Sequence, residues 1–192
     1  MKKDPDAKLV KKAKMGDSKA FGRLVRRYQK KALYLAYDMV GNYTDAQDIA
    51  QNAFFQAFKN IRSFQEKSTF STWLYRIIAN AAIDFQRSKK RRQASSLNQP
   101  AYDEDQQIEV MDTLPETGYS VAEKIERADL SRLIRELAEQ LPPQQRAAFV
   151  LKYFHEKTTA EIAEILSCDS VTVRGHILRA TLKLRKKLKD ER

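Results

Sequence analysis

The sequence predicts an all-α fold of two small helical domains joined by a flexible acidic linker. Only five Gly and five Pro occur among 192 residues, and long stretches contain neither, which favours nearly continuous helix. Apolar residues recur at helical spacing on both sides of a polar, acidic segment that has neither a helical nor a strand period. We therefore expect a first domain at 1–92, the linker at 93–119 and a second domain at 120–192.

The charge balance points to a polyanionic partner. The chain carries 36 Lys and Arg against 25 Asp and Glu, a net charge of +11. Nucleic acid is the first candidate partner, and an anionic membrane surface is the second. No apolar stretch approaches the roughly 20 residues that span a bilayer, and the N-terminus has no signal-peptide segment, so we expect a cytoplasmic protein that does not insert into the membrane. One cysteine and two histidines form no set at metal-ligand spacing, so no metal and no cofactor are expected.

The first long helix is predicted from Asp17 or Ser18, either of which can cap it, to about Val40. Its apolar positions recur at helical spacing, and Gly41-Asn42 ends it. Residues 1–35 hold twelve Lys or Arg against three Asp. We interpret this basic side as a solvated helix face and assign it no specific contact.

A second helix is predicted over 44–61, where Thr44 and Gln47 have the form of a capping box. Acidic, amide and aromatic side chains follow one side of it, namely Asp45, Asp48, Gln51, Asn52 and Phe55. The opposite side carries Ile49, Ala53, Phe54, Ala57, Phe58 and Ile61. The two carboxylates either stabilise the helix dipole or belong to a polar docking surface for a protein, and both interpretations stay open. Acid/base chemistry would need an apolar pocket that separates their pKa values, and nothing in the sequence supplies one.

The stretch FSTWLYRIIANAAIDFQRSKKRR, residues 70–92, is predicted to be one amphipathic helix. Its buried face holds Phe70, Leu74, Ile77, Ile78, Ala81 and Phe85. The other side carries Trp73, Tyr75, Arg76, Asn80 and Arg87, and four consecutive cations end the helix. Stacking rings, hydrogen-bond donors and a cationic end suit a nucleic-acid strand with exposed bases, and the polar loop at 62–69 is long enough to close over an extruded base. The alternative is that the two rings are ordinary core aromatics and the basic run is a solvated helix end.

After the linker, a capping box at Ser120 and Glu123 opens the second domain. Helices are predicted over 121–140, 144–154, 159–166 and 170–188, with a third capping box at Thr158 and Glu161. The last two helices match a helix-turn-helix, with Cys168 as a small buried apolar residue in the turn. The final helix is expected to bury Val171, Val173, Ile177 and Leu184 and to expose Thr172, Arg174, Gly175, His176, Arg179 and Lys183. Its first residues would meet base edges and its later cations would hold phosphates, whereas the alternative is a plain helix pair with a basic tail.

Three motifs, in this order, resemble the extracytoplasmic-function group of the sigma-70 family of bacterial transcription initiation factors. DAQDIAQNAFFQAF is similar to family region 2.2, FSTWLYRIIANAAIDFQR to regions 2.3 and 2.4, and residues 141–186 to region 4. The resemblance implies a dissociable promoter-specificity subunit with no catalysis of its own. Its implied partners are bacterial core RNA polymerase, promoter DNA and an anti-sigma factor of the kind that commonly holds family members inactive. Without these partners we expect a monomer.

The resemblance also implies a role for each group of residues. The core polymerase would be bound by Asp45, Asp48, Gln51, Asn52 and Phe55. The melted minus-10 element would be bound by Ser63, Phe64, Lys67, Trp73, Arg76, Asn80 and Arg87. The minus-35 element would be bound by Lys152, Thr172, Arg174, Gly175, His176, Arg179 and Lys183. The two elements are about 17 base pairs, or roughly 58 Å, apart, and the linker reaches that far only when it is extended.

Some residues depart from the family pattern. Asn52 stands where the family usually has Glu, which predicts weakened or retuned docking on the polymerase. The usual Pro-Val-Gly before the recognition helix is Asp169-Ser170-Val171, and Gly175 and His176 replace Ser and Arg, so the common minus-35 sequence is not carried over.

Two other classes of function were weighed against the initiation factor. The first is a freestanding helix-turn-helix regulator that works without polymerase, and such a protein needs neither the acidic-amide helix at 44–58 nor the aromatic helix at 70–87. The second is an enzyme acting on nucleic acid. It would need a metal-binding carboxylate cluster or a nucleophile with its base, and the sequence has neither.

Overall fold

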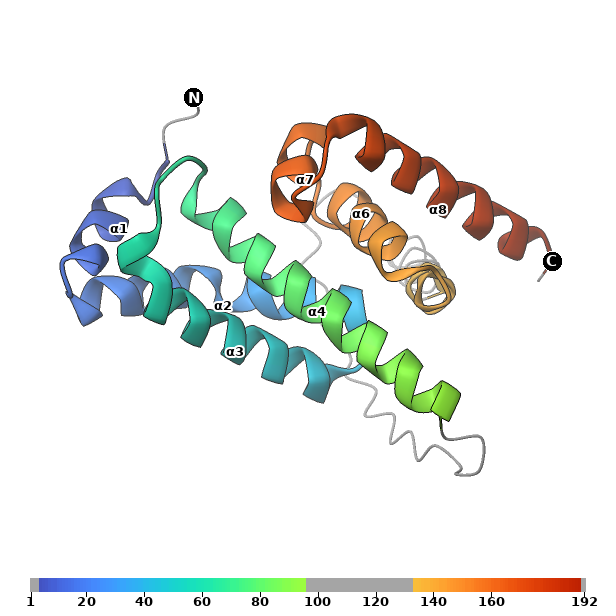
Figure 1. Ribbon diagram of the computed structural model, residues 1–192, viewed down its shortest axis with the longest axis horizontal. Helices are drawn as coiled ribbons and strands as arrows, with labels where there is room; N and C mark the ends of the chain where they lie inside the picture. The colour runs from blue at the N-terminus through green and yellow to red at the C-terminus, as the bar shows by residue number, and fades with distance from the viewer. Residues whose placement is uncertain (1–3, 96–132, 191–192) are drawn as a thin grey trace, which may run out of the picture.

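The N-terminal part of the chain is a bundle of helices around α2. The computed structural model describes residues 4–95 and 133–190. Its first helices are α1 (Ala7–Lys14), α2 (Ser18–Val40), α3 (Tyr43–Asn60) and α4 (Phe70–Ser95), with a short 3-10 helix, η1 (Ile61–Ser63), after α3. Helices α2, α3 and α4 pack against one another, and α1 packs on α2 (Figure 1). The described residues contain no strand, which agrees with the predicted all-α fold.

Local sequence signals set the ends of α2 as predicted. The side chain of Asp17 accepts a hydrogen bond from the backbone N–H of Ala20 at 3.0 Å, which satisfies one of the free donors of the first turn. At the other end Gly41 has a φ of +81°, and its N–H donates to the carbonyl of Tyr37 at 2.8 Å. This left-handed conformation is strained for residues with a Cβ, so glycine is well suited to end the helix here.

Two features at the N-terminal side differ from the prediction. Helix α1 was not expected, and it is anchored by the fully buried Asp6, whose carboxylate accepts hydrogen bonds from Arg27 and Tyr28 of α2. The predicted capping box of Thr44 and Gln47 is wrong, because the N-cap of α3 is Asn42. With Gly41 ending α2, Asn42 takes an extended conformation and accepts from the N–H of Asp45 at 3.0 Å.

The C-terminal part consists of a helical segment at 133–139 followed by α6 (Pro143–Tyr153), α7 (Thr159–Leu166) and α8 (Ser170–Asp190). The predicted capping box at the start of α7 is confirmed: Thr158 accepts from the N–H of Glu161 at 3.2 Å, and Glu161 accepts from the N–H of Thr158 at 2.9 Å. The predicted box at Ser120 and Glu123, the first part of the helix at 121–140 and the linker beyond Ser95 lie outside the described residues.

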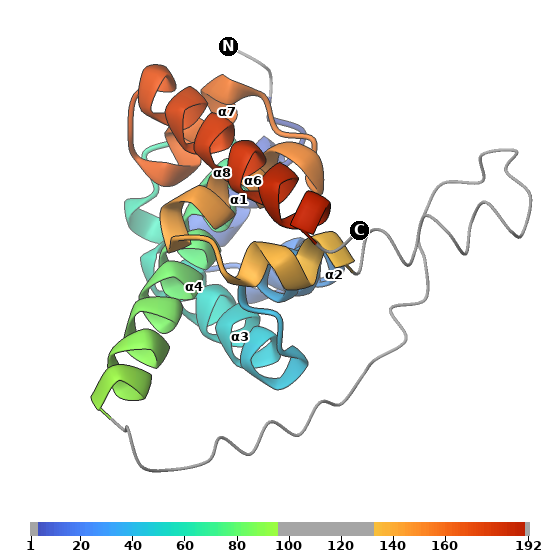
Figure 2. The same ribbon diagram turned by 90° about the vertical axis from the view of Figure 1, so that its right-hand side faces the viewer.

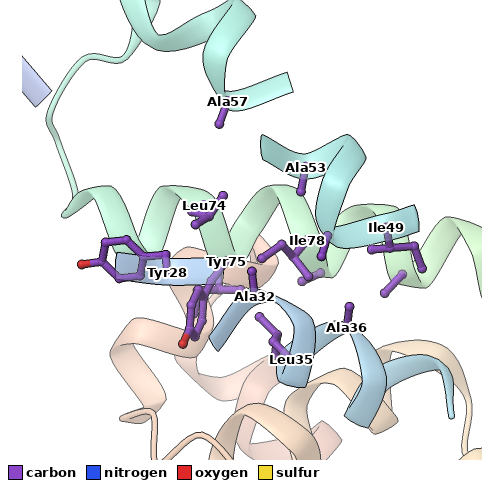
Figure 3. Close-up of a cluster of buried hydrophobic side chains, with 14 of the residues drawn as sticks. Tyr28, Ala32, Leu35, Ala36, Ile49, Ala53, Ala57, Leu74, Tyr75 and Ile78 are labelled. Carbon is purple, nitrogen blue, oxygen red and sulfur yellow. The ribbon is translucent and has the colours of Figure 1, made fainter. Parts of the chain in front are cut away.

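The two parts of the chain pack on each other. Ala147, Val150 and Leu151 of α6 and Ile162 and Ile165 of α7 belong to the same hydrophobic core as the N-terminal helices. Figure 3 shows part of this core, with side chains of α2, α3 and α4 pointing toward one another. Figure 1 shows α6 between α4 and α8, and Figure 2 shows the same stacking from the side. Helix α4 therefore has neighbours on both sides, α2 and α3 on one and α6 and α7 on the other.

Candidate nucleic-acid interface

Helix α3 presents a mixed acidic, amide and aromatic surface to solvent. Asp48, Gln51 and Asn52 are exposed and Asp45 is partly exposed, as the spacing predicted. The ring of Phe55 is 57% exposed, and the ammonium of Lys59 lies 4.3 Å from its centroid. A large exposed aromatic ring among polar groups is typical of a surface that binds another macromolecule.

Phe58 adds a second aromatic ring to this surface, contrary to the sequence prediction. The helical spacing placed Phe58 on the buried side of α3, yet it is 50% exposed. Its ring still meets the ring of the buried Phe21 of α2, at 5.0 Å between centroids. Phe58 lies at the border of the apolar face of α3. How much of its ring is buried therefore depends on how far α2 extends over it.

Trp73 forms the aromatic centre of the α4 surface. Its ring is half-buried, stacks on Phe64 at 4.7 Å with an interplanar angle of 21°, and meets the edge of Phe70 at 5.9 Å. Phe64 is itself only 6% exposed, so this predicted DNA-contacting residue acts as the support beneath Trp73. One face of the indole is therefore held rigidly by aromatic packing.

The loop before α4 is fastened to the bundle by Lys14. Its ammonium donates to the carbonyl of Phe64 at 2.8 Å and to the carboxylate of Glu66 at 2.6 Å. Ser63 and Lys67 of this loop are exposed, and so are Asn80 and Arg87 on α4 itself. The structure thus places the predicted minus-10 residues along the loop and one side of α4, with Trp73 between them.

Tyr75 does not belong to the exposed side of α4, which corrects the sequence prediction. It is 4% exposed, because the C-terminal part covers it: His155 meets its ring edge-on at 6.1 Å between centroids, and the ammonium of Lys157 lies 4.9 Å from its centroid. Burial raises the pKa of the Tyr75 hydroxyl to about 12. The alternative interpretation, an ordinary core aromatic, is therefore correct for Tyr75.

Arg76 is also engaged by the C-terminal part. Its Nε–H donates to the backbone carbonyl of Glu164 in α7 at 2.9 Å. A shallow, open depression lies beside it, lined by Arg76, Glu164, Ser167, Cys168 and Asp169 among others. Burial and the neighbouring Asp169 raise the pKa of the Cys168 thiol, which keeps it protonated and poorly nucleophilic.

Helix α8 carries the predicted recognition residues on an open surface. Arg174, Arg179 and Lys183 are exposed, whereas Thr172, Gly175 and His176 are partly exposed. The Nε–H of Arg174 donates to the carbonyl of Ser170 at 3.2 Å, and that of Arg179 donates to the carbonyl of Gly175 at 3.0 Å. A Cβ at Gly175 would lie 3.2 Å from Nη2 of Arg179, so the glycine makes room for this guanidinium.

Asp169, immediately before α8, has a structural task as well. Asp169 accepts from the N–H groups of Val171 and Thr172, both at 2.8 Å, and from the Thr172 hydroxyl at 2.9 Å. The departure from proline at this position thus supplies an N-cap. Burial, followed by the nearby charge of Arg179, lowers the pKa of His176, so its imidazole is neutral at pH 7.

The outer side of α8 is more apolar than the sequence pattern indicated. Val171 was expected in the core but is 73% exposed, because the helix turns it outward at the first turn. Leu178 and Leu182 are 60% and 55% exposed and were not singled out. Lys152, the remaining predicted minus-35 residue, is partly exposed on α6.

The described residues hold no group of three or more His, Cys, Asp or Glu side chains that could bind a metal ion. None of their helices combines the length and the apolar character that crossing a membrane requires. What the site offers is therefore surface chemistry: aromatic rings, amides, guanidinium groups and ammonium groups on α3, α4 and α8.

Two family models match this chain. The model of Sigma-70 region 2 matches residues 24–92, which include α3 and most of α4, and the model of Sigma-70, region 4 matches residues 131–184. The chain is 39% identical over 189 residues to the ECF RNA polymerase sigma factor SigW of Bacillus subtilis, covering 95% of this chain and 96% of that protein. It is 36% identical over 181 residues to the ECF RNA polymerase sigma-E factor of Escherichia coli K12, covering 91% and 90%.

Solved structures share the fold. CnrH in complex with the cytosolic domain of CnrY gives a TM-score of 0.67 at 24% identity, covering 98% of this chain and all of the other. The sigma factor RpoE in complex with the anti-sigma factor NepR from Bartonella quintana gives a TM-score of 0.63 at 18% identity, covering 91% of this chain and 99% of the other. At identities of 24% and 18%, this likeness shows a shared arrangement of helices.

Proposed function

The chain belongs to the extracytoplasmic-function group of the sigma-70 family of transcription initiation factors, and we propose that α3, α4 and α8 divide its work among three partners. It associates with RNA polymerase and directs it to promoters. In our proposal α3 binds the core polymerase, α4 with the preceding loop binds the melted minus-10 strand, and α8 binds the minus-35 duplex. The domains are 1–92 for the first two tasks and 120–192 for the third, joined by the linker at 93–119.

The role of α3 is supported by its exposed composition. Asp45, Asp48, Gln51 and Asn52 offer oriented polar contacts, and Phe55 offers an apolar anchor at the centre. Acidic residues on so basic a chain would steer docking toward a basic protein surface and away from DNA. Asn52 removes one negative charge that the family usually has here, which makes the surface less acidic.

The role of α4 is supported by Trp73 and its rigid base. An indole held on Phe64 at 4.7 Å can stack on an unpaired base without losing much conformational freedom. Asn80 and Arg76 supply donors for base edges or phosphates, and Arg87 and Ser63 extend the surface at either end. Lys67 of the loop adds a cation for the strand backbone.

The role of α8 is supported by its exposed guanidinium groups. Arg174 and Arg179 lie one and two turns into the helix, where recognition helices meet base edges, and Lys183 and Lys152 are placed to hold phosphates. Gly175 and the neutral His176 provide fewer donors than Ser and Arg would. We therefore propose that this chain selects a minus-35 sequence of its own.

The proposal also covers catalysis, location, oligomeric state and partners. The protein has no catalytic group of its own, acts in the cytoplasm where the polymerase is, and is a monomer when free. Its partners are core RNA polymerase, promoter DNA and an anti-sigma factor. The structure of the sigma factor RpoE with the anti-sigma factor NepR is a complex of this last kind, which supports such a partner.

The observation that carries the proposal is the combination, in one bundle, of the exposed α3 surface and the aromatic α4 surface. A DNA-binding regulator that works alone needs only the helix-turn-helix of α7 and α8. The test is transcription of fragmented genomic DNA by purified bacterial core polymerase, with and without this protein. New discrete start sites that share one motif near minus 35 and another near minus 10 are expected. Unchanged start sites, with retained binding to duplex DNA, would identify a freestanding regulator instead.

A further inference from the structure

Helix α1 holds the first end of the loop before α4, residues 64–69. The ammonium of Lys14, the last residue of α1, donates to the backbone carbonyl of Phe64 at 2.8 Å and to the carboxylate of Glu66 at 2.6 Å. The Lys14 side chain is 28% exposed, so water screens these two bonds less than it screens ion pairs on the open surface. The end of α1 is therefore fixed to the start of the loop.

The residues just before α1 hold the other end of the same loop. Oδ2 of Asp4 accepts from the N–H of Phe70, the first residue of α4, at 2.8 Å, and Oδ1 of Asp4 accepts from the N–H of Asp6 at 2.9 Å. Asp6 is fully buried, and its carboxylate is bonded to two side chains of α2. Asp4 thus supplies an acceptor to a helix start whose N–H groups have no partner within the helix.

Both of the loop ends that are held in this way belong to residues that pack on Trp73. The ring of Phe64 stacks on the indole at 4.7 Å, and the ring of Phe70 meets it at 5.9 Å. The carbonyl of Phe64 is bonded to Lys14, and the N–H of Phe70 is bonded to Asp4. Residues 4–14 therefore fix the backbone beneath the two rings that orient Trp73.

The conformation of the loop shows that it needs support from outside. Glu66 has a φ of +57°, a left-handed conformation that is unfavourable for a residue with a Cβ and persists only where its surroundings hold it. Residues 65–67 are exposed, so packing of their own side chains contributes little. The bonds of Lys14 to Phe64 and Glu66 are placed on either side of residue 65 and supply this support.

Lys14 also differs from the other lysines of α1. Lys8, Lys11 and Lys12 are exposed, as expected for the solvated basic face that the sequence predicted, whereas Lys14 is partly buried against the loop. The match to the family model of Sigma-70 region 2 begins at residue 24, so α1 lies before it. The contacts of Lys14 thus come from the structure of this chain and from neither the charge pattern nor the matched region.

We propose that residues 4–14 form a brace that positions Trp73 for stacking on an unpaired base, with Lys14 and Asp4 as its positioning residues. This inference rests on the proposed function of α4 as the surface for the melted minus-10 strand. Lys14 acts through Phe64 and need not touch the strand. It also offsets the negative charge of Glu66, which would otherwise repel the phosphates of a strand lying along the loop.

The experiment compares two variants of the full chain. Lys14→Met is the test variant, and Lys11→Met is the matched control, because it removes the same charge from an exposed position of the same helix. Trp73 is the single Trp of the chain, so its fluorescence anisotropy and its quenching by acrylamide report how firmly the indole is held. Titration of a short, fluorescently labelled single-stranded DNA of mixed sequence reports strand binding.

The brace predicts two linked results for Lys14→Met. The indole should become more mobile and more easily quenched, and the affinity for the single strand should fall about threefold to tenfold, since part of the stacking on one base is lost. Lys11→Met should leave the indole unchanged and alter strand affinity by less than about twofold. An unchanged indole in Lys14→Met would overturn the brace, and an equal loss of affinity in Lys11→Met would reduce the result to net charge.

A second comparison tests whether Lys14 acts through Trp73. In a Trp73→Ala background, Lys14→Met should lower strand affinity by less than about twofold further, because residues that act as a unit are not additive. A full further loss in this background would show that Lys14 binds the strand directly, which contradicts positioning through the ring. A role in stability alone would lower strand affinity equally in both backgrounds.

A variant at the other end of the brace covers the case in which Lys14→Met fails to fold. Asp4→Ala removes the acceptor for the Phe70 N–H and should move both readouts in the same direction, while Asp4→Asn keeps an acceptor oxygen and should move them less. If Trp73→Ala lowers strand affinity and neither brace variant does, only this inference is lost. If Trp73→Ala leaves strand affinity unchanged, the proposed role of α4 is lost, and the mobility of the indole still shows whether the brace holds it.

Discussion

Helices α4 and α8 carry similar sequences for binding nucleic acid, yet they lie in different surroundings. Both are long, amphipathic and basic toward their C-terminal ends. Helix α8 packs on α6 and α7 and leaves Arg174 and Arg179 exposed. Helix α4 packs on α2 and α3 and also on α6 and α7, so Tyr75 is buried and Arg76 is hydrogen-bonded to the backbone of α7. The surface of α8 that we propose binds the minus-35 element is thus open, while the surface of α4 that we propose binds the minus-10 strand is partly covered by α7.

The difference matters for the proposed roles of these helices. In this structure α8 and α3 present their proposed binding residues to solvent, whereas Arg76 of α4 is hydrogen-bonded to α7. Changes on α8 should therefore act on binding directly, and changes on α4 should act on a later step.

The largest expected effect is on α8. Reversing both charges in Arg174→Glu/Arg179→Glu should abolish selection of minus-35 sequences, with at least a hundredfold loss of duplex affinity, since each contact contributes about 1–3 kcal/mol and reversal adds repulsion from phosphates. Binding to core polymerase should remain, because α3 is unchanged. Both are measured by titrating labelled promoter duplex and labelled core enzyme.

Lys189→Glu is the control for this pair, because Lys189 is an exposed cation in the last turn of the same helix. It should reduce duplex affinity only modestly and leave sequence selection intact. A double variant that loses binding to core polymerase as well would contradict the assignment of α8 to DNA alone.

The next effect is on α4. Trp73→Ala removes the ring that would stack on an unpaired base, and stacking contributes about 1–3 kcal/mol per base. Strand opening should therefore fall roughly tenfold to a hundredfold, measured by permanganate reactivity of promoter thymines. Affinity for duplex containing only a minus-35 element should be unchanged. Trp73→Phe should keep most of the activity, and equal losses of opening and duplex binding in Trp73→Ala would remove this role.

Many of the local features of these helices could be predicted from the sequence. The helical period placed Phe70, Leu74 and Ile78 in the core of α4, and all three are fully buried. The Thr158 capping box fixed the start of α7, because both halves of that signal are local. Family-specific motifs predicted which surfaces bind polymerase and DNA, and this assignment stays a prediction. Features set by residues near each other in the chain were therefore predicted well.

The junction between the two parts was not predicted, because its signals are far apart in the chain. Asp38 meets Arg135 and His155 across 97 and 117 positions. A sequence pattern shows that Asp38 is a lone acid in a basic helix, yet it does not show which cations approach it. The errors at Tyr75, Phe58 and Val171 have the same origin, since the exposure of each depends on where a neighbouring helix lies.

A smaller effect is expected at the end of α2, beside the junction. Gly41 has a φ of +81°, and a Cβ there would lie 1.7 Å from Oε1 of Glu139. Gly41→Ala should lower the free energy of unfolding by about 1–2 kcal/mol, because the left-handed conformation is strained for alanine. The added Cβ would also displace Glu139, whose carboxylate lies 3.7 Å from Nη2 of the buried Arg146. Thermal unfolding measures the combined effect.

Gly22→Ala makes the same substitution within α2, where nothing lies within 4 Å of the added Cβ. It should raise the free energy of unfolding by about 0.5–1 kcal/mol, as alanine does within helices. Equal behaviour of the two variants would show that neither backbone conformation nor Glu139 matters at Gly41.

The smallest effect concerns the cap of α8 and depends on pH. Hydrogen bonds from the backbone and then the side chain of Thr172 lower the pKa of Asp169, so its ionised form is favoured in the folded state. The cap stabilises α8 fully above the carboxyl pKa of the unfolded chain, about 4, and loses strength as pH falls through the lower folded value. Asp169→Ala should weaken minus-35 binding slightly at neutral pH by fraying the first turn, next to Arg174. Asp169→Asn keeps a capping oxygen and should bind like the wild type there, while its stability should depend less on pH below 4. If Asp169→Asn and wild type lose stability in parallel on acidification, another carboxylate governs that transition, and α8 is held by its packing on α6 and α7 alone.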